Sequence, residues 1–128
     1  MKERNVRHEI VLATKFTTTF PDPTKSAPRQ RINFAGNSTK SLHVSLEASL
    51  KKLQTDYVDL LYVHWWDFTT SIPELMQSLN HMVQRGKVLY LGVSDTPAWV
   101  VSKANQCMFL FLLRAPIQCT SGTRWNPI

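Results

Sequence analysis

The chain has 128 residues, of which 43% are hydrophobic, enough for one domain with its own core. No run of eighteen apolar residues and no apolar signal core occur, and two cysteines are too few for a disulfide framework, so we expect a cytoplasmic protein without membrane contact. The net charge of +6 would help to bind an anion such as a nucleotide phosphate, although a solvated surface is the favoured explanation of this charge. The lysines and arginines are scattered and form no basic stripe of the kind that nucleic-acid-binding proteins show.

The first part of the chain predicts a strand, a loop and a helix. Residues 8–16, HEIVLATKF, are short, apolar and β-branched, as in a strand. Residues 21–37 are rich in proline, glycine and polar residues and predict a loop. Four leucines then recur at i, i+4, i+8 and i+11, which places them on one face of a helix. They are Leu42, Leu46, Leu50 and Leu53.

A second strand and helix follow. Residues 57–64, YVDLLYVH, predict a buried strand. Ser71 and Glu74 have the spacing of a capping box, in which each side chain accepts from an unpaired amide at the start of a helix. Gly86 is a natural end for that helix.

The last part of the chain predicts a third strand and a third helix. Residues 87–95, KVLYLGVSD, read as a strand, and Pro97 begins a helix to about Asn105. Residues 107–113, CMFLFLL, have no helical amphipathicity. They fit a buried strand, or a sequence created by altered splicing or by a truncated gene model.

This alternation of apolar strands and amphipathic helices indicates an α/β fold with a parallel sheet and helical crossovers. The predicted links from helix to strand are short, whereas the loop after the first strand is long. Parallel α/β folds bind ligands beyond the carboxyl ends of their strands, where the long loops lie. We therefore look for a site at that end of the sheet.

Polar residues end each of the three predicted strands: Lys15, His64, and the pair Ser94 and Asp95. One such residue is usually a solvated strand end, but three in succession favour a site. A lysine at a dry rim can lower the pKa of a neighbouring acid, and a histidine can steer a carbonyl oxygen. Ser94 and Asp95 can bind an amide group of a ligand, although they also fit a helix cap.

Two tryptophans, Trp65 and Trp66, follow His64 directly. Flat apolar side chains of this kind wall the pockets that hold aromatic or bulky substrates. Packing against the helices is the alternative, and the alternation of side chains along a strand favours it for one of the two.

The segments IVLATKF, SLEASLKKLQTDYVDLLYVHWWD and GKVLYLGVSDTPAWVVSKAN resemble aldo-keto reductases, and more narrowly the fungal aryl-alcohol dehydrogenase and norsolorinic acid reductase-like branch. The resemblance covers about residues 8–105. It implies a partial (β/α)8 TIM barrel, roughly the third to sixth βα units, that reduces aldehydes or ketones, or oxidises aryl alcohols, with NADP(H). It also implies that Lys15 and His64 are catalytic, and that Ser94 and Asp95 hold the nicotinamide carboxamide, where many relatives have Asn in the second place.

The same resemblance implies an Asp and a Tyr of the catalytic tetrad, which belong to barrel units expected before this chain. Tyr62 and Tyr90 lie deeper in the barrel by strand alternation, and we interpret both as interior packing. Residues 106–128 diverge from the family pattern within the same domain. We therefore expect a chain that is inactive or weak alone, and whose binding of NADP(H) alone is doubtful.

Three alternatives remain open. A half barrel has unpaired strand edges, so two copies forming a homodimer, or this chain with a missing half, could restore an active site for a small carbonyl or alcohol substrate. The chain could instead be a non-enzymatic module that binds a protein partner through those edges. A fragment that does not fold cooperatively is the third reading.

Overall fold

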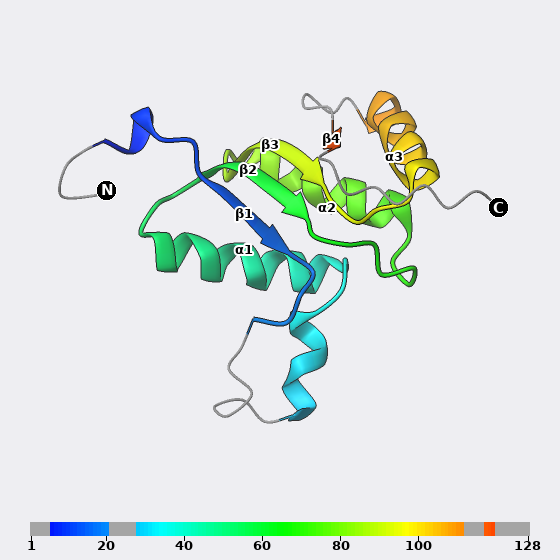
Figure 1. The fold of residues 1–128 in the computed structure, drawn as a ribbon, viewed down its shortest axis with the longest axis horizontal. Coiled ribbons are helices and arrows are strands. Elements are labelled where there is room, and N and C mark those ends of the chain that lie inside the picture. The colour runs from blue at the N-terminus through cyan, green and yellow to red at the C-terminus, as the bar shows by residue number, and fades with distance from the viewer. Residues whose placement is uncertain (1–5, 21–27, 112–116, 120–128) are drawn as a thin grey trace.

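The computed structural model describes residues 6–20, 28–111 and 117–119, which form a parallel sheet with helices between its strands (Figure 1). The elements in chain order are η1 (Arg7–Glu9), β1 (Ala13–Phe16), η2 (Pro28–Phe34), α1 (Thr39–Leu53), β2 (Val58–Val63), α2 (Ile72–Gln84), β3 (Val88–Val93), α3 (Ala98–Phe111) and β4 (Ile117–Cys119). The sheet order is β1-β2-β3-β4, and every neighbouring pair is parallel. Strands that pair in chain order through helical crossovers are typical of an α/β barrel, so the chain forms a partial barrel, as predicted.

One face of the sheet is buried against the helices. Phe16 in β1, Leu61 in β2 and Leu91 in β3 are each at most 2% exposed and belong to one cluster with side chains of α1 and α2. Leu42, Leu46 and Leu50 are also buried in this cluster, and Leu53 packs against it. The leucine spacing therefore predicted the buried face of α1 correctly.

The opposite face of the sheet carries Lys15, Tyr62 and Gly92 side by side, because Lys15 pairs with Tyr62 and Tyr62 pairs with Gly92. A Cβ atom at Gly92 would lie 2.5 Å from ring carbon Cε1 of Tyr62, so glycine leaves the space that this ring fills. Lys15 is exposed, and Tyr90, on the same face, is 60% exposed. This is the face that lines the interior of an α/β barrel, and the described part of the chain leaves Lys15 and Tyr90 on it exposed.

The ends of α2 follow the predicted signals. The Ser71 hydroxyl accepts from the Glu74 amide at 3.3 Å, which is the first half of the capping box. The Glu74 carboxylate instead accepts from the Thr39 hydroxyl at 3.4 Å and so links α2 to α1. Gly86, with a φ of +68°, lies just beyond the helix, where glycine avoids the steric cost of a left-handed backbone.

Three features differ from the prediction. The first strand begins at Ala13 rather than at residue 8: residues 7–9 form the turn η1, and Val11 is 80% exposed. The predicted loop contains η2. Helix α3 continues through residues 107–111, so the strand interpretation of that segment was wrong. No glycine or proline interrupts the chain between Ala98 and Phe111, and residues with good helix propensity continue a helix even where they are apolar on every side.

The described helices include none that is both long and apolar enough to cross a membrane. The predicted divergence after residue 105 falls partly on residues 112–116 and 120–128, which lie outside the described residues.

Candidate active site

Lys15, His64 and Ser94 lie at the carboxyl end of neighbouring strands and on the same face of the sheet. Lys15 pairs with Tyr62, and His64 lies two residues after Tyr62, so its side chain is on the same face of the sheet. The His64 amide donates to the Phe16 carbonyl at 3.3 Å, and the Ser94 amide donates to the Val63 carbonyl at 3.0 Å, which extends the parallel pairing past the strand ends. His64 and Ser94 therefore form the outer layer of this rim, and Lys15 lies one layer deeper.

The ammonium group of Lys15 has no carboxylate within ion-pair distance among the described residues. Its Nζ lies 5.4 Å from the centroid of the Tyr62 ring, a weak cation–π contact. An exposed lysine held only in this way is free to pair with an anionic ligand or to polarise a neighbouring acid.

His64 is half-buried, and its side chain meets the loop after β1. Its Nδ1 lies 3.2 Å from the Thr18 hydroxyl oxygen, which also accepts from the indole N–H of Trp65 at 2.9 Å. Nothing in the described part of the chain contacts the other ring nitrogen, Nε2, as a hydrogen-bond partner. One ring nitrogen of His64 is therefore held by the protein and the other is available to a ligand.

The two tryptophans have different environments. Trp65 is half-buried beside Thr18, so its ring can still form a wall of a site at this rim. Trp66 is 6% exposed and belongs to the core cluster. The prediction that both wall a substrate pocket fails for Trp66, whose side chain lies in the core cluster. Strand β2 ends at Val63, so the alternation of side chains along a strand no longer sets the side on which Trp66 lies.

Ser94 and Asp95 end β3 with two different kinds of group. The Ser94 hydroxyl donates to the His64 carbonyl at 2.7 Å, which leaves the lone pairs of its oxygen free to accept from a ligand amide. The Asp95 side chain is exposed, and none of the described residues donates a hydrogen bond to its carboxylate. Asp95 has a left-handed backbone with a φ of +43°, a conformation that Asp and Asn tolerate better than most residues.

A buried polar cluster that sequence reasoning missed holds this rim together. Asn37 is completely buried, and its side-chain amide donates to the Thr17 hydroxyl at 3.0 Å and to the Trp65 carbonyl at 3.1 Å. Its side-chain oxygen accepts from the Asp67 amide at 2.8 Å. The Thr17 hydroxyl oxygen also accepts from the His64 amide at 3.3 Å, so Asn37 and Thr17 together tie the loop after β1 to His64 and to the residues that follow it.

Asp67 completes the cluster by accepting hydrogen bonds from Asn37, Thr69 and Thr70. Burial raises the pKa of Asp67, but these amide and hydroxyl donors outweigh it, so the pKa lies below the ordinary aspartate value. Gly36 has a φ of +78°, and a Cβ atom there would lie 2.8 Å from the Asp67 carboxylate. Glycine is required for the backbone to approach this carboxylate.

Thr17 is the strained residue of the rim. Its φ is +98°, a region that β-branched residues rarely adopt. Its carbonyl accepts from the Gly36 amide at 2.8 Å, and its hydroxyl is held by Asn37 as described, so hydrogen bonds offset the strain. Backbone strain of this kind is common where a chain must present a functional group. Here the strained Thr17 is followed by Thr18, whose hydroxyl lies beside His64.

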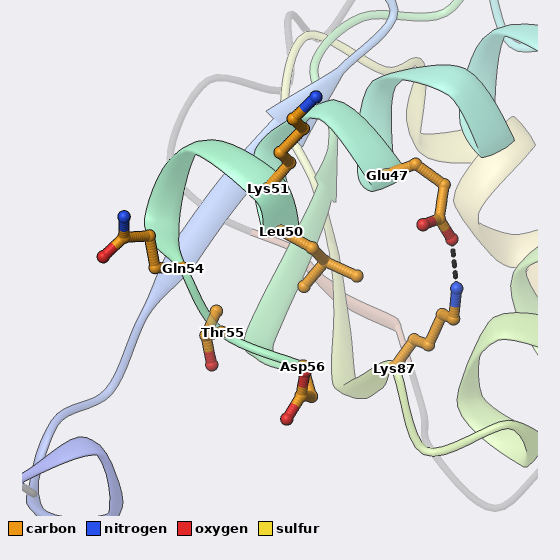
Figure 2. Close-up of a pocket in the computed structure, with 7 residues that line it drawn as sticks. All are labelled: Glu47, Leu50, Lys51, Gln54, Thr55, Asp56 and Lys87. Carbon is orange, nitrogen blue, oxygen red and sulfur yellow. Dashed lines mark hydrogen bonds and ion pairs between the residues drawn. The ribbon is translucent and has the colours of Figure 1, made fainter. Parts of the chain in front are cut away.

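A hollow of about 430 Å³ lies at the other end of the sheet (Figure 2). It is lined by Glu47, Leu50, Lys51, Gln54, Thr55, Asp56 and Lys87, which come from the end of α1 and from the residues before β2 and β3. An ion pair between Lys87 and Glu47 crosses its rim, and the hydrogen bond from Lys87 lowers the pKa of Glu47. This hollow opens at the amino ends of the strands, opposite His64, and is not part of the candidate active site.

Comparison with known proteins gives one family. The model of the aldo/keto reductase family matches residues 1–117. Norsolorinic acid reductase B of Dothistroma septosporum is 65% identical over 106 residues, which are 83% of this chain and 26% of that protein. A putative aryl-alcohol dehydrogenase of Saccharomyces cerevisiae is 59% identical over 105 residues, 82% of this chain and 36% of that protein. The chain thus spans well under half of the length of the curated relatives it matches.

Proposed function

The chain belongs to the aldo/keto reductase family, and from this premise we propose that it forms part of the active site of an NADP(H)-dependent enzyme that interconverts carbonyls and alcohols. The observation that supports this proposal is the placement of Lys15, His64 and Ser94 on one face and one end of the parallel sheet. That end is where α/β barrels carry their active sites.

We assign the roles from the groups that each side chain leaves available. His64 Nε2 donates to the substrate carbonyl oxygen and orients it. Lys15, which has no carboxylate partner in the described part of the chain, stabilises the deprotonated form of a neighbouring acid and so eases its loss of a proton to that oxygen.

The residues at the end of β3 fit the carboxamide of a nicotinamide. The Ser94 oxygen accepts from the amide N–H, and the exposed Asp95 carboxylate is a second acceptor. When bound, the nicotinamide supplies or takes up the hydride. The phosphates of this cofactor suit the positive charge of the chain.

The chain by itself carries only part of this chemistry. The family resemblance implies an Asp and a Tyr in addition to Lys15 and His64, and Tyr62, in the same layer as Lys15, is packed over Gly92. We therefore propose that the isolated chain is inactive or weak. Its natural substrates are aromatic or polyketide-like carbonyls and alcohols, a class suggested by the names of its relatives and compatible with Trp65 at the rim.

A segment exchange tests this proposal. The matching 106-residue segment of norsolorinic acid reductase B is replaced by that of this chain, and NADPH oxidation with an aromatic aldehyde is followed. The exchanged enzyme is expected to keep activity within about ten-fold, and Lys15→Met or His64→Gln in the exchanged segment to lower kcat by about 100-fold or more. A fully active Lys15→Met, His64→Gln double variant contradicts the assigned roles.

A second possibility is an active assembly of two copies. The open inner face and the unpaired edge of β1 motivate it, since two four-stranded arcs supply the eight strands of a barrel. Light scattering and NADPH titration of the purified chain distinguish the cases. A dimer that oxidises NADPH supports assembly, whereas a folded chain without any NADPH binding supports a non-enzymatic binding module.

A further inference from the structure

We propose that Trp65 and Thr18 form a hydrogen-bond relay that fixes the tautomer and ring orientation of His64. The relay consists of two contacts that share one oxygen atom. The indole N–H of Trp65 donates to Thr18 Oγ1 at 2.9 Å, and the same Oγ1 lies 3.2 Å from Nδ1 of His64.

The Thr18 oxygen has two lone pairs, of which one accepts from Trp65, and the proposed direction of the second hydrogen bond is from the Thr18 hydroxyl to His64 Nδ1. An indole N–H can only donate, so Thr18 Oγ1 is the acceptor in its contact with Trp65. The single hydroxyl hydrogen of Thr18 is then free to point at His64. Nδ1 of His64 accepts it, and a neutral imidazole whose Nδ1 is an acceptor carries its hydrogen on Nε2.

The backbone around Thr18 keeps this oxygen in place. Thr17 is held in its strained conformation by Asn37 and Gly36, and the Thr17 hydroxyl also accepts from the His64 amide at 3.3 Å. The loop that carries Thr18 is therefore fixed to His64 by hydrogen bonds of both backbone and side-chain groups. This accounts for a β-branched residue with a φ of +98° at this point of the chain.

The consequence is a His64 that presents an N–H donor to a ligand. Within the part of the chain that the structure describes, Nε2 has no hydrogen-bond partner. The catalytic use of this donor rests on the proposed function, but the tautomer itself does not. Thr18 and Trp65 are accordingly positioning residues, which act on a substrate only through His64.

The test is nitrogen NMR of the full chain, uniformly labelled with ¹⁵N, at a pH where His64 is neutral. A His64→Gln variant assigns the ring signals among the four histidines. The wild type is expected to carry its hydrogen on Nε2. Thr18→Val removes the hydroxyl and keeps the shape, and it should lower the ratio of the Nε2–H to the Nδ1–H tautomer about five-fold, the usual effect of one net hydrogen bond.

Three further variants separate positioning from folding. Thr18→Ser keeps the hydroxyl and should restore the wild-type ratio. Trp65→Phe keeps an aromatic ring but removes the indole donor that competes for the Thr18 oxygen, so acceptance from Nδ1–H becomes more favourable and the ratio should fall by a smaller factor. Thr19→Val is the matched control, because no described residue is hydrogen-bonded to the Thr19 hydroxyl, and it should change nothing.

Two results overturn the proposal: a wild-type His64 with its hydrogen on Nδ1, or a folded Thr18→Val chain with an unchanged tautomer ratio. Circular dichroism shows whether each variant is folded. If Thr18→Val does not fold, Thr18→Ser and Trp65→Phe decide alone. None of these readouts needs NADPH or turnover, so their failure is distinguishable from a failure of the segment exchange.

Discussion

At the amino end of the strands, charged side chains are paired with one another, whereas at the carboxyl end the lysine has no described partner. Arg7 contacts Asp59 at 2.7 Å, and Lys87 pairs with Glu47. The ammonium group of Lys15, at the other end of the sheet, lies over the ring of Tyr62 and forms no ion pair with any described residue. A charge that already has a partner is not available to a ligand, whereas Lys15 is, so paired and available charges lie at opposite ends of the same strands.

The Arg7 pair shows how complete the pairing is at the amino end. The guanidinium also donates to the hydroxyl of Thr55 and to the carbonyls of Ile10 and Tyr57. Burial raises the pKa of Asp59, but hydrogen bonds from the Leu12 amide and from Arg7 outweigh it, so this pKa lies below the ordinary aspartate value. At the carboxyl end the loops are held differently, by hydrogen bonds that Asn37 forms with neutral groups and with the Asp67 carboxylate.

The largest expected effect is at the Asn37–Asp67 cluster. Asp67→Ala leaves the backbone amide of Asn37 without its acceptor and should lower the free energy of unfolding by about 3 kcal/mol in urea denaturation. The matched control is Asp56→Ala at the amino end, where Asp56 is exposed, and its effect should stay within about 0.5 kcal/mol. Equal losses in the free energy of unfolding for Asp67→Ala and Asp56→Ala would show that the hydrogen bonds of Asp67 do not hold the carboxyl end in place.

Acid unfolding sharpens the same test. The pKa of Asp67 is lower in the folded than in the unfolded chain, so the unfolded chain binds more protons as the pH falls below about 4. This contribution to stability is present above the unfolded pKa and is lost as the pH falls through the folded one. Asp67→Ala should therefore show a shallower loss of stability in this range, with the remaining slope due to Asp59 and other carboxylates.

At the amino end, Arg7→Met should lower the free energy of unfolding by about 2 kcal/mol, because Asp59 is left partly buried without its partner. Asp59→Asn in the same chain should recover part of the loss. A double-mutant cycle measures this coupling, and a coupling energy near zero would mean that the pair contributes nothing to stability.

The inner face between the two ends is tested by Gly92→Ala. The new methyl group would lie 2.5 Å from the Tyr62 ring, so the ring must move. Since Tyr62 is half-buried on an open face, the ring can swing outward and the cost should be only about 1 kcal/mol. Tyr62→Leu should remove most of that cost. A loss of stability of several kcal/mol would instead indicate that this face is covered in solution.

The sequence predicted those parts of the molecule that depend on local spacing. The leucine repeat identified the buried face of α1, the Ser71 and Glu74 spacing located the start of α2, and strand ends identified Lys15, His64 and Ser94 as one rim. Each of these signals lies within one element or follows from the parallel order of the strands. The roles of the rim residues stay predictions until the segment exchange is made.

The missed features depend on contacts between distant parts of the chain. Asn37 and Asp67 are thirty residues apart, and nothing in the spacing of either residue indicates that they meet. The strained Thr17 and its neighbour Thr18 look like ordinary loop residues in a run of threonines. The burial of Trp66 could not be predicted, because strict alternation after His64 would turn Trp65 toward the helices, whereas β2 ends at Val63 and Trp66 is the buried one.

The smallest expected change in stability tests the comparison most directly, since it uses two lysines at opposite ends of the sheet. Lys87→Met removes the pair with the half-exposed Glu47 and should cost about 0.5 kcal/mol. Lys15→Met removes a charge that has no described carboxylate partner, and it should leave the free energy of unfolding unchanged or slightly raised. In the exchanged enzyme the order reverses, with activity lost in Lys15→Met and kept in Lys87→Met. A loss of more than about 2 kcal/mol in the free energy of unfolding of Lys15→Met would show that Lys15 has a partner, so that the charges at both ends of the sheet are paired.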